Sequence, residues 1–299
     1  MLSLEGVSKK YGDREVLKNI TFDVEEGIIF AVLGHNGAGK TTLIKCIMEL
    51  TDCTGNISYA FSKKDLYGNV SLQMQSSVFE DDARVYEICQ FYKKMYGSDV
   101  NLEELLEEFG LLDFKKSLIN NLSGGEKQKL SILLTLINQP KIIIFDEITT
   151  GLDILARRKI WNIIKRINKE YGTTIILTSH FLDEIEYLAQ EVLIIEKGEK
   201  ILNGSVKEII DKSFSNKKQI SFSLPETADK SAVINELQAT KNEHGKYEIE
   251  FDPKYESEMF EKVVKCHGSD INVKNYSFED AFLKTLGYSI NENGEINRE

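Results

Sequence analysis

A glycine-rich segment ending in lysine and threonine is the first part of the chain whose residue types suggest a definite chemistry. It has the spacing Gly-x-x-x-x-Gly-Lys-Thr, follows the apolar run 28–33 and precedes apolar residues at helical spacing. Glycines let backbone N–H groups converge on a phosphate, and the positive end of the following helix attracts the same anion. We therefore expect Lys40 to reach the β- and γ-phosphates of a nucleotide and the Thr41 hydroxyl to bind Mg²⁺. The whole phosphate-binding segment consists of Gly34, His35, Asn36, Gly37, Ala38, Gly39, Lys40, Thr41 and Thr42.

Two adjacent carboxylates follow a second apolar run. Asp146 and Glu147 come directly after residues 142–145. A carboxylate at the end of a strand can hold a nucleotide-bound magnesium ion through water. Because side chains alternate in direction along an extended chain, Asp146 can face the metal while Glu147 points toward the water that attacks the γ-phosphate. An isolated Asp-Glu pair is usually a solvated turn, but a phosphate-binding segment in the same chain favours the catalytic interpretation.

A second glycine pair precedes an amphipathic helix that ends at Pro140. Its residues are Ser123, Gly124, Gly125 and Glu126, preceded by a leucine. Ser123 is a natural N-cap, so one interpretation is an ordinary capped helix start. The alternative is that Ser123 and the glycine amides bind an anion. Because the phosphate-binding segment of the same chain already holds a nucleotide, that anion would come from another molecule, and two copies facing each other would supply it.

The elements that must position these residues are three short, continuously apolar runs, residues 28–33, 142–145 and 174–178. Such runs are typical of parallel strands buried on both faces, and each is followed by polar or glycine-rich residues and a helix-like stretch. In an α/β sheet, ligands bind beyond the carboxyl ends of the strands. The phosphate-binding segment, the Asp-Glu pair and His180, which follows the third run, are therefore expected at one edge.

Two regions have a different pattern of apolar residues. Residues 80–120 show helical periodicity without a strand-like run, which predicts a helical insertion. After about residue 212, alternating segments at 219–224 and 246–251 are separated by helix-like stretches near 230–239 and 256–266. This pattern predicts a small separate α+β domain.

Composition excludes several classes of protein. The chain has 299 residues and a formal net charge of -11, and no basic run stands out, so we expect no nucleic-acid partner. Its four cysteines form no CxxC pair, which gives no indication of a zinc site or a disulfide framework. The longest apolar run is far shorter than the roughly 18 residues that a membrane span needs. With no signal-like segment at its start, the protein is expected in the cytoplasm.

In the order of these motifs, residues 2–215 resemble the ATP-binding cassette of ABC transporters. The resemblance implies an α/β P-loop NTPase fold for residues 1–215, with a helical subdomain at about 76–140. The α+β accessory domain predicted from the residue pattern then occupies residues 216–299. The resemblance also implies a further set of site residues: Tyr11 stacking on adenine, Gln75 as the Q-loop glutamine, Asp153 in the D-loop and His180 as the γ-phosphate sensor. Gln73 is a rival to Gln75, which we prefer because it stands at the exit of the strand-like segment 70–75.

The family's mechanism implies two cassettes that meet head to tail, with ATP and Mg²⁺ held between the phosphate-binding segment of one and residues Ser123 to Glu126 of the other. Catalytic roles then fall to Lys40, Glu147 and His180, and Thr41, Gln75 and Asp146 are the magnesium ligands. Glu126, Ile148 and Thr150 replace the family's more frequent Gln, Pro and Ser. The partner cassette is accordingly either an identical chain or a related one.

A cassette without a membrane span implies a separate permease, docked on the helical insertion and the Q-loop, that contacts a small-molecule or peptide cargo. Residues 276–284 resemble the Ser-Leu-Glu-Asp-Val-Phe-Leu ending of ATPase subunits that work with ABC-2 type export permeases. The leading hypothesis is an exporter motor bound peripherally at the cytoplasmic face of the cell membrane. One alternative is an importer ATPase with a C-terminal regulatory domain. Another, less favoured, is a non-transport ABC ATPase acting on nucleic acid or ribosomes.

Overall fold

The computed structural model divides the chain into two compact units, Met1–Ser205 and Val206–Glu299. It describes residues 1–74, 82–225, 233–234, 237–242, 245–285, 288–290 and 296–298. Gln75 lies outside the described residues. None of the described helices is long and apolar enough to cross a membrane.

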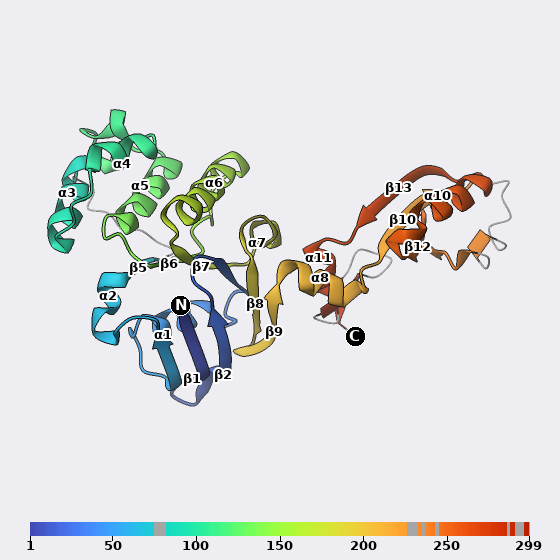
Figure 1. Cartoon of the computed structure of the whole chain (residues 1–299), viewed down its shortest axis with the longest axis horizontal. Helices are drawn as coiled ribbons and strands as arrows, with labels where there is room; N and C mark the ends of the chain where they lie inside the picture. The colour runs from blue at the N-terminus through green and yellow to red at the C-terminus, as the bar shows by residue number, and fades with distance from the viewer. Residues whose placement is uncertain are drawn as a thin grey trace. The chain divides into compact units, whose positions relative to one another are not determined.

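A six-stranded sheet forms the centre of the first unit (Figure 1), in the order β5-β6-β7-β3-β8-β9. Its strands are β5 (Val70–Gln73), β6 (Ile142–Asp146), β7 (Thr174–Ser179), β3 (Ile29–Leu33), β8 (Glu191–Glu196) and β9 (Glu199–Ser205). All neighbours pair in parallel except β9, which runs antiparallel to β8. Every residue of β3, β6 and β7 is buried, which confirms the strands predicted from the three apolar runs.

An antiparallel sheet that the sequence analysis did not anticipate packs against this centre. It has the order β2-β1-β4, with β1 (Leu2–Tyr11), β2 (Arg14–Val24) and β4 (Thr54–Tyr59). Its buried side chains join those of β3 and helix α1 (Lys40–Ile47) in one apolar cluster. Within that cluster the Phe22 and Phe30 rings stack with centroids 5.1 Å apart. This packing fixes the helix that follows the phosphate-binding segment.

Helices form a group of their own in the segment where a helical insertion was predicted (Figure 1). The helices of the first unit after α1 are α2 (Leu66–Asn69), α3 (Val85–Tyr96), α4 (Leu102–Glu108), α5 (Gly124–Leu136), α6 (Ile154–Tyr171) and α7 (Leu182–Leu188). Helix α3 buries Val85 and Cys89 but leaves Phe91 and Met95 more than half exposed. The apolar residues Val78 and Phe79, which precede this helix in the sequence, lie outside the described residues.

The second unit is an α+β structure with a four-stranded antiparallel sheet in the order β11-β12-β10-β13 and a separate antiparallel pair, β14-β15. Its elements are α8 (Val206–Phe214), β10 (Lys218–Ser223), β11 (Thr240–Lys241), β12 (Tyr247–Phe251), α10 (Glu256–Lys265), β13 (Ser269–Asn275), α11 (Phe278–Thr285), β14 (Tyr288–Ile290) and β15 (Ile296–Arg298). Alternate residues of β10 and β12 pack with Val263 of α10 in a separate apolar core.

The division between the units lies ten residues before the expected boundary at 215/216. The reason is helix α8, which packs on α11 of the second unit. Phe214 of α8 stacks on Tyr276 with ring centroids 3.6 Å apart, and Lys284 lies 4.5 Å over the Phe214 ring. Sequence texture showed where the alternating strands begin, but it did not show which unit the preceding amphipathic helix would join.

Candidate nucleotide-binding site

The phosphate-binding segment connects β3 to α1 in a conformation that requires glycine at two close approaches. A Cβ on Gly34 would lie 2.5 Å from the carbonyl oxygen of Ile195. Gly39, the N-cap of α1, has a φ of 112°, and a Cβ there would lie 2.9 Å from a methyl carbon of Leu17. The tight turn therefore depends on missing side chains, and it places the first N–H groups of α1 at the surface of a pocket.

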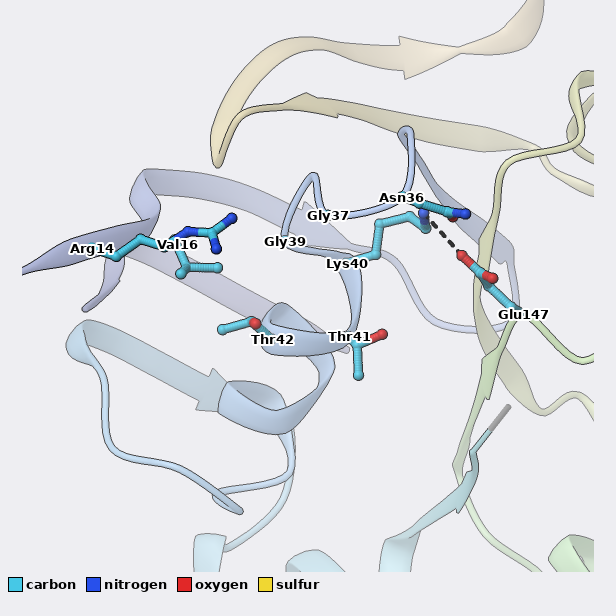
Figure 2. Close-up of a pocket in the computed structure, with 9 residues that line it drawn as sticks. All are labelled: Arg14, Val16, Asn36, Gly37, Gly39, Lys40, Thr41, Thr42 and Glu147. Atoms are coloured by element: carbon cyan, nitrogen blue, oxygen red, sulfur yellow. Dashed lines mark ion pairs between the residues drawn. The ribbon is translucent and has the colours of Figure 1, made fainter. Parts of the chain in front are cut away.

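Lys40 is almost completely buried beneath that turn, with only 4% of its surface exposed. Its Nζ donates to the carbonyl oxygens of Gly34 at 2.7 Å and His35 at 3.2 Å. Figure 2 shows the same ammonium group pointing across the pocket to Glu147, whose Oε1 lies 3.0 Å away. The buried ammonium charge is tolerated because two carbonyl oxygens and one carboxylate oxygen lie within contact distance of it.

Asp146 is the second buried charge of the site. Its Oδ2 accepts a hydrogen bond from Thr41 at 2.9 Å, and its Oδ1 accepts one from Thr178 at 2.5 Å. The Thr178 hydroxyl also accepts from the backbone N–H of Glu147 at 3.1 Å. Thr178 was not singled out from the sequence, although its place at the end of the third apolar run is the signal that would have found it. These contacts join three segments that lie far apart in the chain.

The two adjacent acids diverge by a different route from the one predicted. Strand β6 ends at Asp146, and Glu147 adopts a positive φ of 49°. The divergence therefore comes from a left-handed turn and not from alternation along an extended strand. It directs Glu147 toward Lys40 and toward His180, whose Nδ1 lies 3.6 Å from Glu147 Oε2, just beyond hydrogen-bond distance. The structure thus brings Lys40, Thr41, Asp146, Glu147 and His180 together, as expected.

Lys40, Thr41 and Glu147 border a pocket of about 410 Å³, whereas Asp146 and His180 contact these residues without lining it. The described residues that line it are Arg14, Val16, Asn36, Gly37, Gly39, Lys40, Thr41, Thr42 and Glu147. Among the predicted residues of the segment, Ala38 is buried against the fold and His35 is exposed outside this lining.

Two lining residues come from the hairpin that follows Tyr11, the residue expected to stack on adenine. Tyr11 does not line the pocket, and its ring carries Lys9 Nζ at 4.8 Å from the centroid. Arg14 pairs opposite Tyr11 at the turn between β1 and β2, and Figure 2 shows its guanidinium reaching toward the phosphate-binding turn. Sequence reasoning missed Arg14 and Val16 because only the hairpin register reveals which of its side chains face the turn.

The Ser-Gly-Gly segment begins helix α5 with a capping box, in which Ser123 and Glu126 bond to each other's backbone. The Glu126 carboxylate accepts from the Ser123 N–H at 2.8 Å and from the Ser123 hydroxyl at 2.7 Å, while the hydroxyl accepts from the Glu126 N–H at 3.3 Å. These hydrogen bonds lower the pKa of Glu126. The capped helix start is therefore confirmed, whereas the anion-binding interpretation stays a prediction.

A second hollow of about 500 Å³ lies against this cap and the D-loop. Asp153 contributes to it and caps α6, because its Oδ1 accepts from the Ala156 N–H at 2.8 Å. No described residue lines both this hollow and the pocket at Lys40. Within one copy, the two candidate phosphate sites are separate.

Comparisons with known proteins agree with this geometry. The family model described as ABC transporter matches residues 17–150. The chain is 31% identical over 241 residues to the methionine import ATP-binding protein MetN of Campylobacter jejuni, covering 70% of this chain and 72% of that protein. It is 33% identical over 221 residues to the Nod factor export ATP-binding protein I of Ralstonia nicotianae, covering 70% and 68%. The chain belongs to the ATP-binding proteins of ABC transporters.

A solved structure supports the same assignment. The cbiO1 protein of Clostridium perfringens, part of the ABC transporter complex cbiONQ, superposes with a TM-score of 0.63 at 27% identity, over 71% of this chain and 90% of that one. The fold is thus that of an ABC ATPase cassette, and the chain is an ATP-binding, ATP-hydrolysing subunit of a transporter. Relatives of the chain include importers and exporters alike.

Proposed function

We propose that this chain is the motor subunit of an ABC exporter, in which two copies or related cassettes bind two ATP molecules head to tail and drive a separate ABC-2 type permease. The observation that carries the ATPase part is the convergence of Lys40, Thr41, Asp146, Glu147 and His180 at one edge of the sheet, beside the pocket. Groups that far apart in sequence meet only because the carboxyl ends of parallel strands share that edge.

The residues present fit an ATP–Mg²⁺ complex. The amides at the start of α1 and the Lys40 ammonium supply positive charge to phosphates, and Thr41 and Asp146 place a hydroxyl and a carboxylate side by side at 2.9 Å. Gln75 is proposed as the further ligand. When bound, the magnesium ion would neutralise charge on the β- and γ-phosphate oxygens.

In the proposed reaction, Lys40 exchanges its carboxylate partner for the γ-phosphate. The present 3.0 Å ion pair to Glu147 would open, leaving the Glu147 carboxylate to accept a proton from the attacking water. Lys40 would then stabilise the charge that develops on the phosphoryl oxygens, and His180, close to the same carboxylate, would contact the γ-phosphate. Arg14 and Val16 line the pocket beyond the phosphates and are proposed to contact the nucleoside, together with or in place of Tyr11.

The second half of each site is proposed to come from the other cassette. Ser123 and Gly124 are exposed and border a hollow that Lys40 does not reach, so they are free to meet the ATP of a facing copy. ATP would then act as an interfacial ligand that favours the dimer, and hydrolysis would release it.

Export is supported by the tail and by some relatives. Helix α11 carries the motif-like residues Phe278 and Phe282 buried, and Ser277 caps it by accepting from the Asp280 N–H at 3.1 Å. The permease is proposed to dock on helix α3, where Phe91 and Met95 stay exposed, which would hold the chain peripherally at the cytoplasmic face of the membrane. The cargo would be a small molecule or peptide contacted by the permease.

An importer with a regulatory C-terminal domain is the second candidate. The similarity to a methionine importer ATPase favours it, as does the separate apolar core of the second unit. Its mark would be inhibition of ATPase activity by a small molecule that depends on residues 206–299.

Co-purification of the tagged chain from detergent-solubilised membranes, with ATP and vanadate present, tests the proposal. Recovery of an ABC-2 type permease by mass spectrometry is the expected result. Recovery of an importer permease would favour the second candidate. Recovery with ribosomes or nucleic acid, without a membrane protein, would contradict both.

A further inference from the structure

A buried carboxylate that has no assigned role in hydrolysis is hydrogen-bonded to residues beside those that have one. Glu184 belongs to helix α7, four residues after His180, and only 3% of its surface is exposed. A carboxylate in such a place is costly unless it is hydrogen-bonded, so its partners show what it holds.

The partners of Glu184 come from three different segments. Its Oε1 accepts from the Trp161 indole at 2.7 Å and from the Thr149 hydroxyl at 2.9 Å. The Ser179 hydroxyl is a third hydrogen-bond partner. Burial raises the pKa of Glu184, while these donors and Arg157 oppose that shift. All three donor residues are themselves buried, so water does not compete for these bonds.

Two of the three donors, Ser179 and Thr149, lie close in sequence to residues assigned to ATP hydrolysis. Ser179 directly precedes His180, and its hydroxyl also accepts from the N–H of Phe181 at 2.9 Å. The hydrogen bonds of Ser179 therefore fix the backbone on both sides of the histidine. Thr149 lies two residues after Glu147, in the turn where the Thr150 N–H donates to the Glu147 carbonyl at 3.1 Å.

The third donor links the same carboxylate to the D-loop. Trp161 belongs to α6, the helix that Asp153 caps, and it faces α7. One turn closer to the cap, the Arg157 guanidinium lies 4.4 Å over the Phe181 ring and 3.5 Å from Asp183. The start of α6 is thus held to the segment that carries His180.

We propose that Glu184 is a positioning residue for hydrolysis, which sets His180, the turn at Glu147 and the D-loop helix in one mutual register through its three hydrogen-bond donors. The proposal rests on the function proposed above. Glu184 does not touch the nucleotide pocket, so its removal changes the alignment of groups that act on the γ-phosphate and leaves the phosphate-binding segment as it is.

The test compares Glu184→Gln with the parent chain. Glutamine keeps the shape and one acceptor oxygen but loses the charge and the second acceptor. We expect kcat for ATP to fall about tenfold to a hundredfold, while KM and the affinity of the monomer for ATP change less than about twofold. The imidazole NMR signal of His180, one of four histidines, should shift in Glu184→Gln.

Asn168→Ala is the matched control, on α6, the helix that carries the donor Trp161. It removes the hydrogen bonds that Asn168 donates to the carbonyls of Gly27 and Thr173, away from the pocket. Stability should fall, with kcat within about twofold and the His180 signal unmoved. If Glu184→Gln does not fold, Thr149→Val and Ser179→Ala each remove one donor and carry the same measurement.

An unchanged kcat, an unmoved His180 signal, or a rise in KM that accounts for the loss would overturn the positioning role. Failure of the proposed function is distinguishable, because Lys40→Ala would then hydrolyse ATP as fast as the parent chain whatever happens at Glu184.

Discussion

The pocket at Lys40 and the hollow at Ser123 are both proposed to contact phosphate, yet they are built in opposite ways. At the pocket, Lys40 and Asp146 are buried and bonded to groups from distant segments. The side chain of Glu147 is 11% exposed and pairs with Lys40. At the hollow, Ser123 is exposed and bonds mainly to Glu126, three residues away in the same cap. The first is held by the tertiary fold, whereas the second is local and faces outward.

This difference indicates how the pocket and the exposed cap each contribute to nucleotide binding. A preorganised pocket binds nucleotide without a partner, because its charges are already in place. An exposed cap adds to binding only when a second surface brings a phosphate to it. In the proposed function, the chain therefore carries one complete half of a site and the complementary half of another.

Lys40→Ala should have the largest effect, because it removes the buried charge of the preorganised pocket. Loss of the ammonium also leaves Glu147 without its 3.0 Å ion-pair partner. We expect kcat/KM for ATP to fall at least about a thousandfold in a steady-state phosphate-release assay. Lys45→Ala, near the end of the same helix, is the control and should keep near-parental activity. Retention of more than a tenth of the parental rate by Lys40→Ala would contradict the assignment.

Glu147→Gln should separate binding from hydrolysis within the same pocket. The amide cannot accept the proton of the attacking water, so kcat should fall by about 10² to 10⁴. ATP affinity should hold or rise, because a negative charge close to the phosphates is removed. Single-turnover hydrolysis and equilibrium binding of ATP measure the two effects, with Glu170→Gln at the far end of α6 as the control. Turnover as fast as the parent would show that another group acts as the base.

Ser123→Arg should break the exposed half alone. The bulky cation fills the hollow at the α5 cap, so nucleotide binding by the monomer should stay within about twofold while steady-state hydrolysis drops about a hundredfold. Ser123→Thr keeps the capping hydroxyl and should behave like the parent. Equal loss of monomer binding and turnover in Ser123→Arg would mean that the two hollows are not independent.

Glu126→Gln should have the smallest effect. Its hydrogen bonds to Ser123 lower the pKa of Glu126 below its ordinary 4.5. A depressed pKa stabilises the fold above about pH 4.5, and this contribution is lost as the pH falls through the folded-state pKa. Because the cap is exposed, the variant should lose at most about 0.5 kcal/mol at neutral pH. Denaturant unfolding at pH 7 and pH 3 should show that difference at the higher pH alone.

Much of the fold and of the buried half-site could be predicted from the sequence, because three apolar runs define central parallel strands whose ends must meet. The groups at those ends, from Lys40 to His180, follow from that arrangement. Arg14 and Glu184 could not be predicted in the same way, since their roles depend on hairpin register or on contacts between distant segments. The unit to which α8 belongs could not be predicted either, because an amphipathic face does not specify which core it joins.

Sedimentation of Glu147→Gln with and without ATP tests the central claim, that each nucleotide is held between two cassettes, most directly. The account predicts that ATP doubles the sedimenting mass of Glu147→Gln, and that Glu147→Gln combined with Ser123→Arg binds ATP but stays monomeric. ATP-driven dimerisation of the double variant, or a Glu147→Gln chain that stays monomeric with ATP bound, would contradict the composite site.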